Sequence, residues 1–177
     1  MKWFIYILII VAVVVLQQSF FNIWYLGSYT PDLLLLISLA IVLATNNFDF
    51  LLFAILGGFW TEVSYGLPVG SLIVSLIITG SLAYLIINRW LFSEKSWQHF
   101  FGAVAIGTIL LHLWLWIYTS ILFIFGWSEV AITGRMFLQS LLPSLLVNLL
   151  CTYPIFAGVE VLVGFIQKRM RPSVIKI

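Results

Sequence analysis

Charged residues are scarce in this chain. Lys, Arg, Asp and Glu make up 8% of its 177 residues, and the formal net charge is +2. A water-soluble domain could not hide the large apolar fraction that remains, so the solvent must be lipid. A net charge this small also gives no basis for nucleic-acid binding. The composition therefore excludes an ordinary soluble domain and a nucleic-acid-binding protein.

Cysteine and catalytic motifs are almost absent as well. The single cysteine, Cys151, lies inside an apolar run, which excludes an internal disulfide and a cysteine-based metal site. The chain has no Gly-x-Ser-x-Gly, no His-Glu-x-x-His and no phosphate-binding glycine loop. His99 and His112 have no third ligand in helical register. We therefore expect no cofactor, no metal and no enzymatic activity.

Apolar and aromatic side chains dominate the sequence. Hydrophobic residues make up 63% and aromatic residues 17% of the chain, with a mean hydropathy of +1.18. Roughly 20 apolar residues span a bilayer as a helix, because the hydrocarbon is about 30 Å thick and a helix rises about 1.5 Å per residue. We predict an all-α polytopic membrane protein, a single bundle of about six transmembrane helices over residues 1–177. The predicted spans are residues 3–21, 31–45, 50–65, 67–87, 100–125 and 136–166.

Three regions need separate interpretation. Lys2 and the apolar run after it resemble a secretory signal, but residues 17–19 lack a small-x-small cleavage pattern, so we expect an uncleaved first span. The second and third spans are short. Such helices could be tilted little, lie in a thinned bilayer, or pair with each other as a tight hairpin. The sixth contains Pro143 and Pro154, which predict a kinked or tilted helix.

Basic residues predict the orientation of the bundle. With the N-terminus in the cytoplasm, only Arg135 of the eight Lys and Arg residues falls outside. Positive charge accumulates in cytoplasmic loops, and the basic tail, residues 167–177, is cytoplasmic only if the number of spans is even. We therefore expect a multi-pass protein of the bacterial inner membrane with both termini in the cytoplasm. The inside residues are Lys2, Arg89, Lys95, Lys168, Arg169, Arg171 and Lys176.

Three ionisable side chains lie deep in predicted spans, where such groups are functional candidates by default. Glu62 could be a proton or substrate site, lining a cavity with Trp60 and Tyr65, or a hydrogen-bonded carboxyl that fixes helix packing. His112 could be a ligand or an interhelical hydrogen-bonding group. Glu160 could reach the inner interface or pair with a basic residue there.

The sequence Thr30-Pro31-Asp32 is a helix-start signal. It combines a capping hydroxyl, a proline where no N–H donor is needed, and a carboxylate beside the positive end of the helix. This pattern explains Asp32 without a catalytic role.

Small and weakly polar residues recur every four positions in two spans, which places them on one helix face. Ala54 with Gly58, and Ala103 with Gly107, form further small-xxx-small pairs. Such faces let another backbone come close, either within the bundle or on a partner protein. The two four-residue series are Ser71, Ser75, Thr79 and Ala83, and Ser140, Ser144 and Asn148.

The first half of the chain resembles one known family, the rod shape-determining protein MreD. That family has a short first span ending near a glutamine, a Pro-Asp-Leu start to the second span, an acidic residue ending a glycine-spaced third span, and a Pro-x-Gly turn. The acidic residue is usually Asp in the family and is Glu62 here. The second half agrees in span count, length and basic tail. The matching residues are Leu16-Gln17, Pro31-Asp32, Gly58, Glu62 and Pro68-x-Gly70.

The resemblance implies a non-enzymatic scaffold of the bacterial cell-elongation machinery. Such a subunit binds a single-span MreC-like membrane protein, reaches other elongation proteins through it, and supports peptidoglycan synthesis. The family's fold is similar to that of the substrate-binding subunit of energy-coupling-factor vitamin transporters, so the alternative function is small-molecule binding for transport. A third hypothesis is that the chain is a lipid-handling membrane enzyme, which requires Glu62 and His112 to meet.

Overall fold

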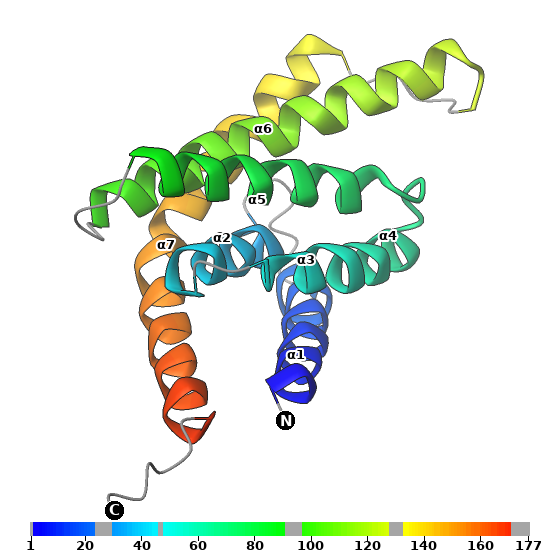
Figure 1. Ribbon diagram of the computed structural model, residues 1–177. Helices are drawn as coiled ribbons and strands as arrows, with labels where there is room; N and C mark the ends of the chain where they lie inside the picture. Colours follow the sequence, from blue (N-terminus) through cyan, green and yellow to red (C-terminus); the bar gives the residue numbers. More distant parts are fainter. Residues whose placement is uncertain (1, 24–29, 46–47, 91–96, 128–132, 171–177) are drawn as a thin grey trace, which may run out of the picture.

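The structure is a computed structural model that describes residues 2–23, 30–45, 48–90, 97–127 and 133–170. These residues form helices joined by turns, with no strand among them, so the all-α prediction is confirmed for this part of the chain. Six helical segments are described, because α3, η2 and α4 follow one another without a break (Figure 1). In chain order the elements are α1 (Lys2–Ile23), α2 (Leu33–Thr45), α3 (Phe50–Leu52), the π-helix η2 (Phe53–Gly57), α4 (Gly58–Tyr65), α5 (Ser71–Trp90), α6 (Trp97–Ile124) and α7 (Gly134–Met170).

Two of these helices are long and apolar enough to cross a membrane. They are Phe100–Ile124 within α6 and Gly134–Phe165 within α7, with mean hydropathies of 2.0 and 1.8. Shorter apolar helices cover Trp3–Ser19, Leu33–Thr45, Phe50–Tyr65 and Ser71–Leu85. The structure therefore agrees with membrane association.

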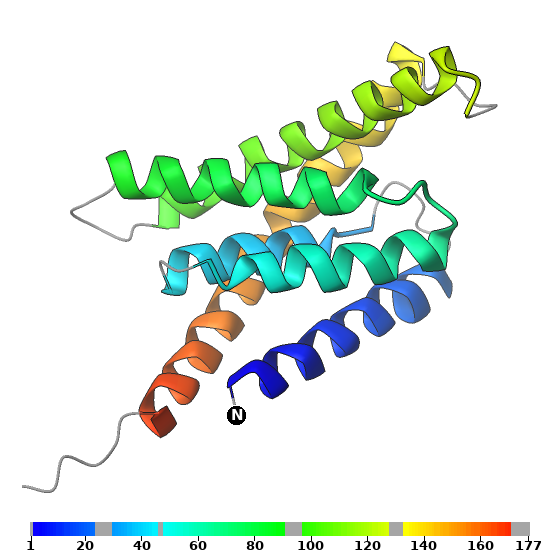
Figure 2. The ribbon, with the colours of Figure 1, turned by 45° about the vertical axis from the view of Figure 1, so that its right-hand side comes forward.

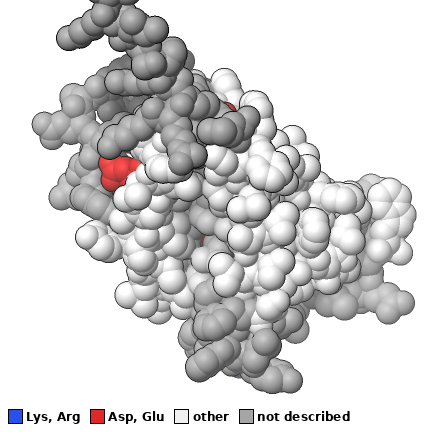
Figure 3. Space-filling view, turned by 90° about the horizontal axis from the view of Figure 1, so that it is seen from below, with Lys and Arg blue, Asp and Glu red and all other residues white. Residues whose placement is uncertain are grey.

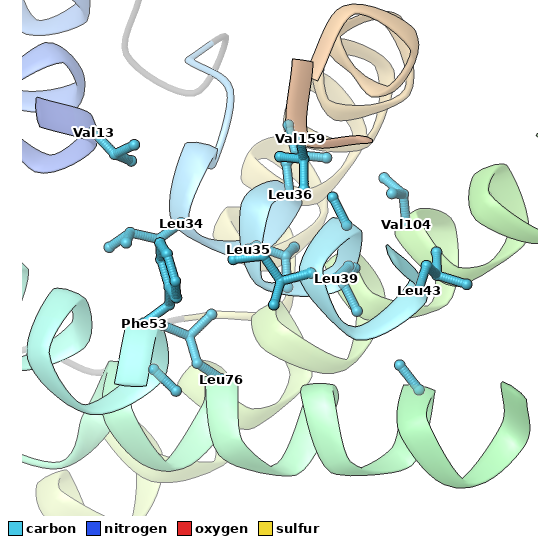
Figure 4. Close-up of a cluster of buried hydrophobic side chains, with 14 of the residues drawn as sticks. Val13, Leu34, Leu35, Leu36, Leu39, Leu43, Phe53, Leu76, Val104 and Val159 are labelled. Carbon is cyan, nitrogen blue, oxygen red and sulfur yellow. The ribbon is translucent and has the colours of Figure 1, made fainter. Parts of the chain in front are cut away.

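The short helix α2 is the centre of the bundle. Nine of its 13 residues are buried, and it packs against α1, α5, α6 and α7. A helix that is apolar on every side is one that other helices enclose, which explains how so short a segment can form the core. Figure 4 shows the leucines of α2 meeting side chains of the surrounding helices. The labelled residues are Val13, Leu34, Leu35, Leu36, Leu39, Leu43, Phe53, Leu76, Val104 and Val159.

The helices run between two ends of the bundle, which Figure 2 separates. The N-terminus, the last turn of α2 and the last turn of α7 lie on the left, and the turn between α4 and α5 lies on the right, as does the end of α6. We call the right-hand end the turn end, after residues 66–70.

The turn at residues 66–70 corrects one predicted boundary. The fourth segment was expected to begin at residue 67, but α5 begins at Ser71. Gly66 ends α4 with φ of 63°, and Gly70 has φ of 97°. Only glycine adopts this left-handed conformation without strain, so these two glycines hold the chain in a turn.

The α5 series of small residues faces the interior. Ser71, Ser75, Thr79 and Ala83 are all buried, and α5 packs on α2, α4 and α6. An added Cβ at Gly107 of α6 would lie 3.1 Å from the Thr79 side chain, so the two helices approach closely at that point. This face is therefore used for packing inside the bundle.

Replacing Gly58 by alanine is expected to lower the free energy of unfolding by up to about 2 kcal/mol. A Cβ at Gly58 would lie 3.1 Å from the Cα of Ile73 and 3.2 Å from its backbone nitrogen, and backbone cannot rotate aside. Overpacking costs about 1–3 kcal/mol, offset by about 1 kcal/mol of better helix propensity. Thermal unfolding of the purified protein in detergent measures the change.

The matched control is Gly158→Ala on α7, where an added Cβ meets nothing within 4 Å. That variant should unfold at or slightly above the temperature of the parent protein. If Gly58→Ala and Gly158→Ala unfold at the same temperature, then α4 and α5 do not pack through Gly58.

Candidate functional site

Glu62 is fully buried and holds the start of α5. Its carboxylate accepts hydrogen bonds from the backbone N–H groups of Gly70 at 2.9 Å, of Leu72, and of Ile73 at 2.9 Å. The Ser71 hydroxyl donates a longer bond of 3.5 Å. The first N–H groups of a helix have no partner within the helix, and the positive end of the helix dipole attracts a carboxylate. Glu62 is therefore a cap that ties α4 to α5.

The π-helix η2 orients the side chains that follow it. An extra residue in a helical turn rotates everything after it by about 100° relative to an uninterrupted α-helix. After η2, Thr61 and Glu62 are buried, and the Thr61 hydroxyl donates to the Gly57 carbonyl at 2.8 Å. Trp60, by contrast, is 49% exposed. Residues two positions apart lie about 200° apart around a helix, so Trp60 and Glu62 face different sides and the structure does not bring them together here.

Asp32 caps α2 at the predicted helix start. Its Oδ1 accepts a hydrogen bond from the Leu35 N–H at 3.1 Å, the geometry of an N-cap residue. The predicted capping residue was Thr30, two positions earlier, so the start is found but the cap is corrected. The reason is that α2 begins at Leu33, directly after Asp32.

A buried hydrogen-bond network joins α2, α6 and α7 through Asn148. The Asn148 Oδ1 accepts from the backbone N–H of Asp32 at 2.8 Å, and its Nδ2 donates to the Thr108 hydroxyl at 3.1 Å. Asn148 and Thr108 are both fully buried, and Thr152 donates to the Asn148 carbonyl at 2.7 Å. Of the predicted α7 series, Asn148 is thus internal, whereas Ser140 and Ser144 are partly exposed.

The hypothesis of a lipid-handling enzyme requires Glu62 and His112 to meet, but these two side chains have separate partners. The Nδ1 of His112 lies 3.0 Å from the Thr108 carbonyl on its own helix, and its ring interacts electrostatically with Asp32. Glu62 bonds with the start of α5, as described above. Glu160 is exposed on α7, and the side chains of the basic residues after it lie outside the described residues.

A pocket of about 210 Å³ lies at the turn end, between α1, α2, α4 and α5. Leucines from α2, the turn and α5 form its apolar wall. Tyr65 lines it, whereas neither Glu62 nor Trp60 is among its lining residues. The polar side chains of the lining are Gln17, Thr30, Asp32, Thr61 and Tyr65, and the apolar ones are Leu34, Leu67, Leu72 and Leu76.

Sequence reasoning missed two buried contacts. The Tyr6 hydroxyl donates to the Asp49 carboxylate at 3.3 Å, joining α1 to the start of α3, and both residues are buried. Thr108 was not singled out either. The available signal was a polar side chain inside an apolar segment, which marks Tyr6 and Thr108 as needing partners but does not identify those partners.

Over the residues that the structure describes, the protein is all-α, and two of the described helices are long and apolar enough to cross a membrane. Comparison of the chain with known protein families, with curated proteins and with solved structures finds no match. Within the described ranges, no group of three or more His, Cys, Asp or Glu side chains is placed to hold a metal ion.

Proposed function

We propose that this chain is a multi-pass protein of the bacterial inner membrane, with six spans and both ends in the cytoplasm. Its exposed apolar side chains support this proposal, because large surfaces of this kind are stable in lipid and not in water. Leu150, Val161 and Trp127 are each at least 75% exposed. Figure 3 shows one face on which few acidic groups are visible among the described atoms.

Within the membrane, the proposed role is a non-enzymatic scaffold of the cell-elongation machinery, resembling MreD and binding a single-span MreC-like protein. The observation that carries this proposal is the use of the deep polar side chains. Glu62 holds α5, Asn148 joins three helices, and Asp49 accepts from Tyr6. Since these groups serve helix packing, the apolar outer faces remain for contact with other membrane proteins.

Affinity purification of the tagged protein from gently solubilised membranes tests the scaffold. We expect a single-span protein with a periplasmic domain to be recovered together with other elongation proteins, and depletion of the chain to make rod-shaped cells round. An unrelated tagged multi-pass protein, expressed at the same level, is the control. Normal rod shape after depletion, with no membrane partner above that control, would contradict the proposal.

The pocket at the turn end favours a second candidate function, the substrate-binding subunit of a transporter. Its volume of about 210 Å³ is smaller than the roughly 300–1,000 Å³ typical of ligand pockets, which counts against a vitamin-sized solute. If the chain is a transport subunit, the same purification should recover a small solute and ATPase subunits. That outcome would replace the scaffold with the transporter.

A further inference from the structure

The chemistry of the pocket at the turn end narrows what can bind there. Two helix N-termini border it, those of α2 and α5, and free N-termini would favour an anion. Both are already capped by carboxylates. Asp32 accepts from Leu35 at the start of α2, and Glu62 accepts from three N–H groups at the start of α5. The donors that an anion needs are therefore already used.

Each of the remaining polar side chains of the pocket carries at least one oxygen that can accept a hydrogen bond. Asp32 lines the pocket, no Lys or Arg is among the lining residues, and the basic side chain that interacts with Asp32 is His112, outside the lining. Tyr65, which also lines the pocket, contributes its hydroxyl. The Thr61 hydroxyl already donates to Gly57, so its oxygen is left as an acceptor. A carboxylate among hydroxyl oxygens suits a ligand that is positively charged and carries several N–H donors.

Gln17 adds an acceptor on the α1 side of the pocket. Its Oε1 is buried and has no hydrogen-bond partner in the part of the chain that the structure describes. An unpartnered buried amide oxygen costs about 1–3 kcal/mol. Rotation about the last side-chain bond of Gln17, which is soft, can bring this oxygen to a donor inside the pocket.

From these contacts we infer that the pocket binds a primary ammonium group, with the Asp32 carboxylate as its counter-ion and the Gln17 amide and Tyr65 hydroxyl as further acceptors. The small volume admits a head group or a short amine, and the leucine wall contacts its carbon atoms. The ammonium can come from the ethanolamine head group of a phospholipid or from a free amine. In the orientation proposed above, the turn end lies at the outer surface of the membrane.

Thermal unfolding of the full-length protein in lipid nanodiscs tests this site. The discs contain phosphatidylcholine alone, phosphatidylcholine with phosphatidylethanolamine, or phosphatidylcholine with phosphatidylglycerol, all with the same acyl chains. Ethanolamine is titrated into the first set, with ethylene glycol as the uncharged control of similar size. Stabilisation by phosphatidylethanolamine alone identifies a lipid head group, and stabilisation by ethanolamine in its absence identifies a free amine.

Asp32→Asn is the decisive variant, because asparagine caps a helix as well as aspartate does but carries no charge. We expect the apparent affinity for the ammonium ligand to fall at least tenfold. Glu160→Gln removes the same charge from an exposed position on α7 and should bind as the parent protein does. Leu67→Trp, at a partly exposed position of the pocket wall, is the second variant and should abolish binding by filling the pocket without disturbing the core.

Three results would overturn the inference. The first is equal stabilisation by ethanolamine and ethylene glycol. The second is no stabilisation by either ammonium source. The third is full ligand binding by both Asp32→Asn and Leu67→Trp. None of these results bears on the scaffold, whose test is the capture of a membrane partner.

Discussion

Replacing Glu62 by alanine is expected to lower the free energy of unfolding by about 3 kcal/mol, the largest effect of any single change proposed for this chain. The alanine leaves the backbone N–H groups of Gly70, Leu72 and Ile73 without their acceptor. Each unpaired buried donor costs about 1–3 kcal/mol, and loss of a helix cap alone costs about 1 kcal/mol. In a chain of this size the unfolding temperature should fall by roughly 6–12 °C.

Glu62→Gln separates the hydrogen bonds from the side-chain volume. The amide keeps one oxygen, which can still accept from Leu72 and Ile73, but its NH₂ group faces the Gly70 N–H. We expect a loss of about 1 kcal/mol, roughly one hydrogen bond. Glu160→Gln and Glu160→Ala, at an exposed position, are the controls and should change stability by less than about 0.5 kcal/mol. Equal unfolding temperatures for Glu62→Ala and Glu160→Ala would refute the cap.

Asn148→Ala is expected to lower the free energy of unfolding by about 2–3 kcal/mol. It removes the acceptor of the Asp32 N–H and the donor to Thr108 together, at a fully buried position. The two groups left behind lie directly before α2 and on α6, and neither can reach water without separating the helices. Thermal unfolding in the same detergent measures this loss.

Two further variants sharpen the test of Asn148. Asn148→Asp keeps an oxygen for the Asp32 N–H but loses the donor to Thr108 and adds a carboxylate near that of Asp32, so it should destabilise at least as much as alanine. Ser140→Ala is the control on the same predicted face, because the Ser140 hydroxyl donates to the Phe137 carbonyl of its own helix, at 3.0 Å. If Asn148→Ala and Ser140→Ala unfold at the same temperature, then the hydrogen-bond network does not join the three helices.

Substitutions at Glu62 and at Asp32 test two different properties of the protein, its stability and its ligand binding. Glu62 was the residue expected to control solute binding if the chain serves a transporter. Its carboxylate instead accepts from the start of α5 and does not line the pocket. Ligand binding should therefore respond to Asp32, while stability responds to Glu62. A ligand lost equally from Asp32→Asn and from a folded Glu62→Gln protein would contradict this division.

Local patterns in the sequence were enough to predict several elements. The apolar segments correspond to the helices, because the length of an apolar run is a property of neighbouring residues. The start of α2 follows from Pro31 and Asp32, and the buried face of α5 follows from small residues spaced by four. In each of these cases, the residues that carry the signal lie within a few turns of one another.

The sequence by itself determined the apolar segments that form the described helices and the polar side chains that would need partners. Only the tertiary structure decided which hydrogen-bonding groups those side chains meet. Asn148 bonds residues 116 and 40 positions away, and no local spacing encodes contacts of that range. The π-helix η2 set which side of α4 turns inward, with Thr61 and Glu62 buried and Trp60 half exposed, since a one-residue change in helical register rotates every later side chain. The pocket, assembled from α1, α2, α4 and α5, exists only where those helices converge.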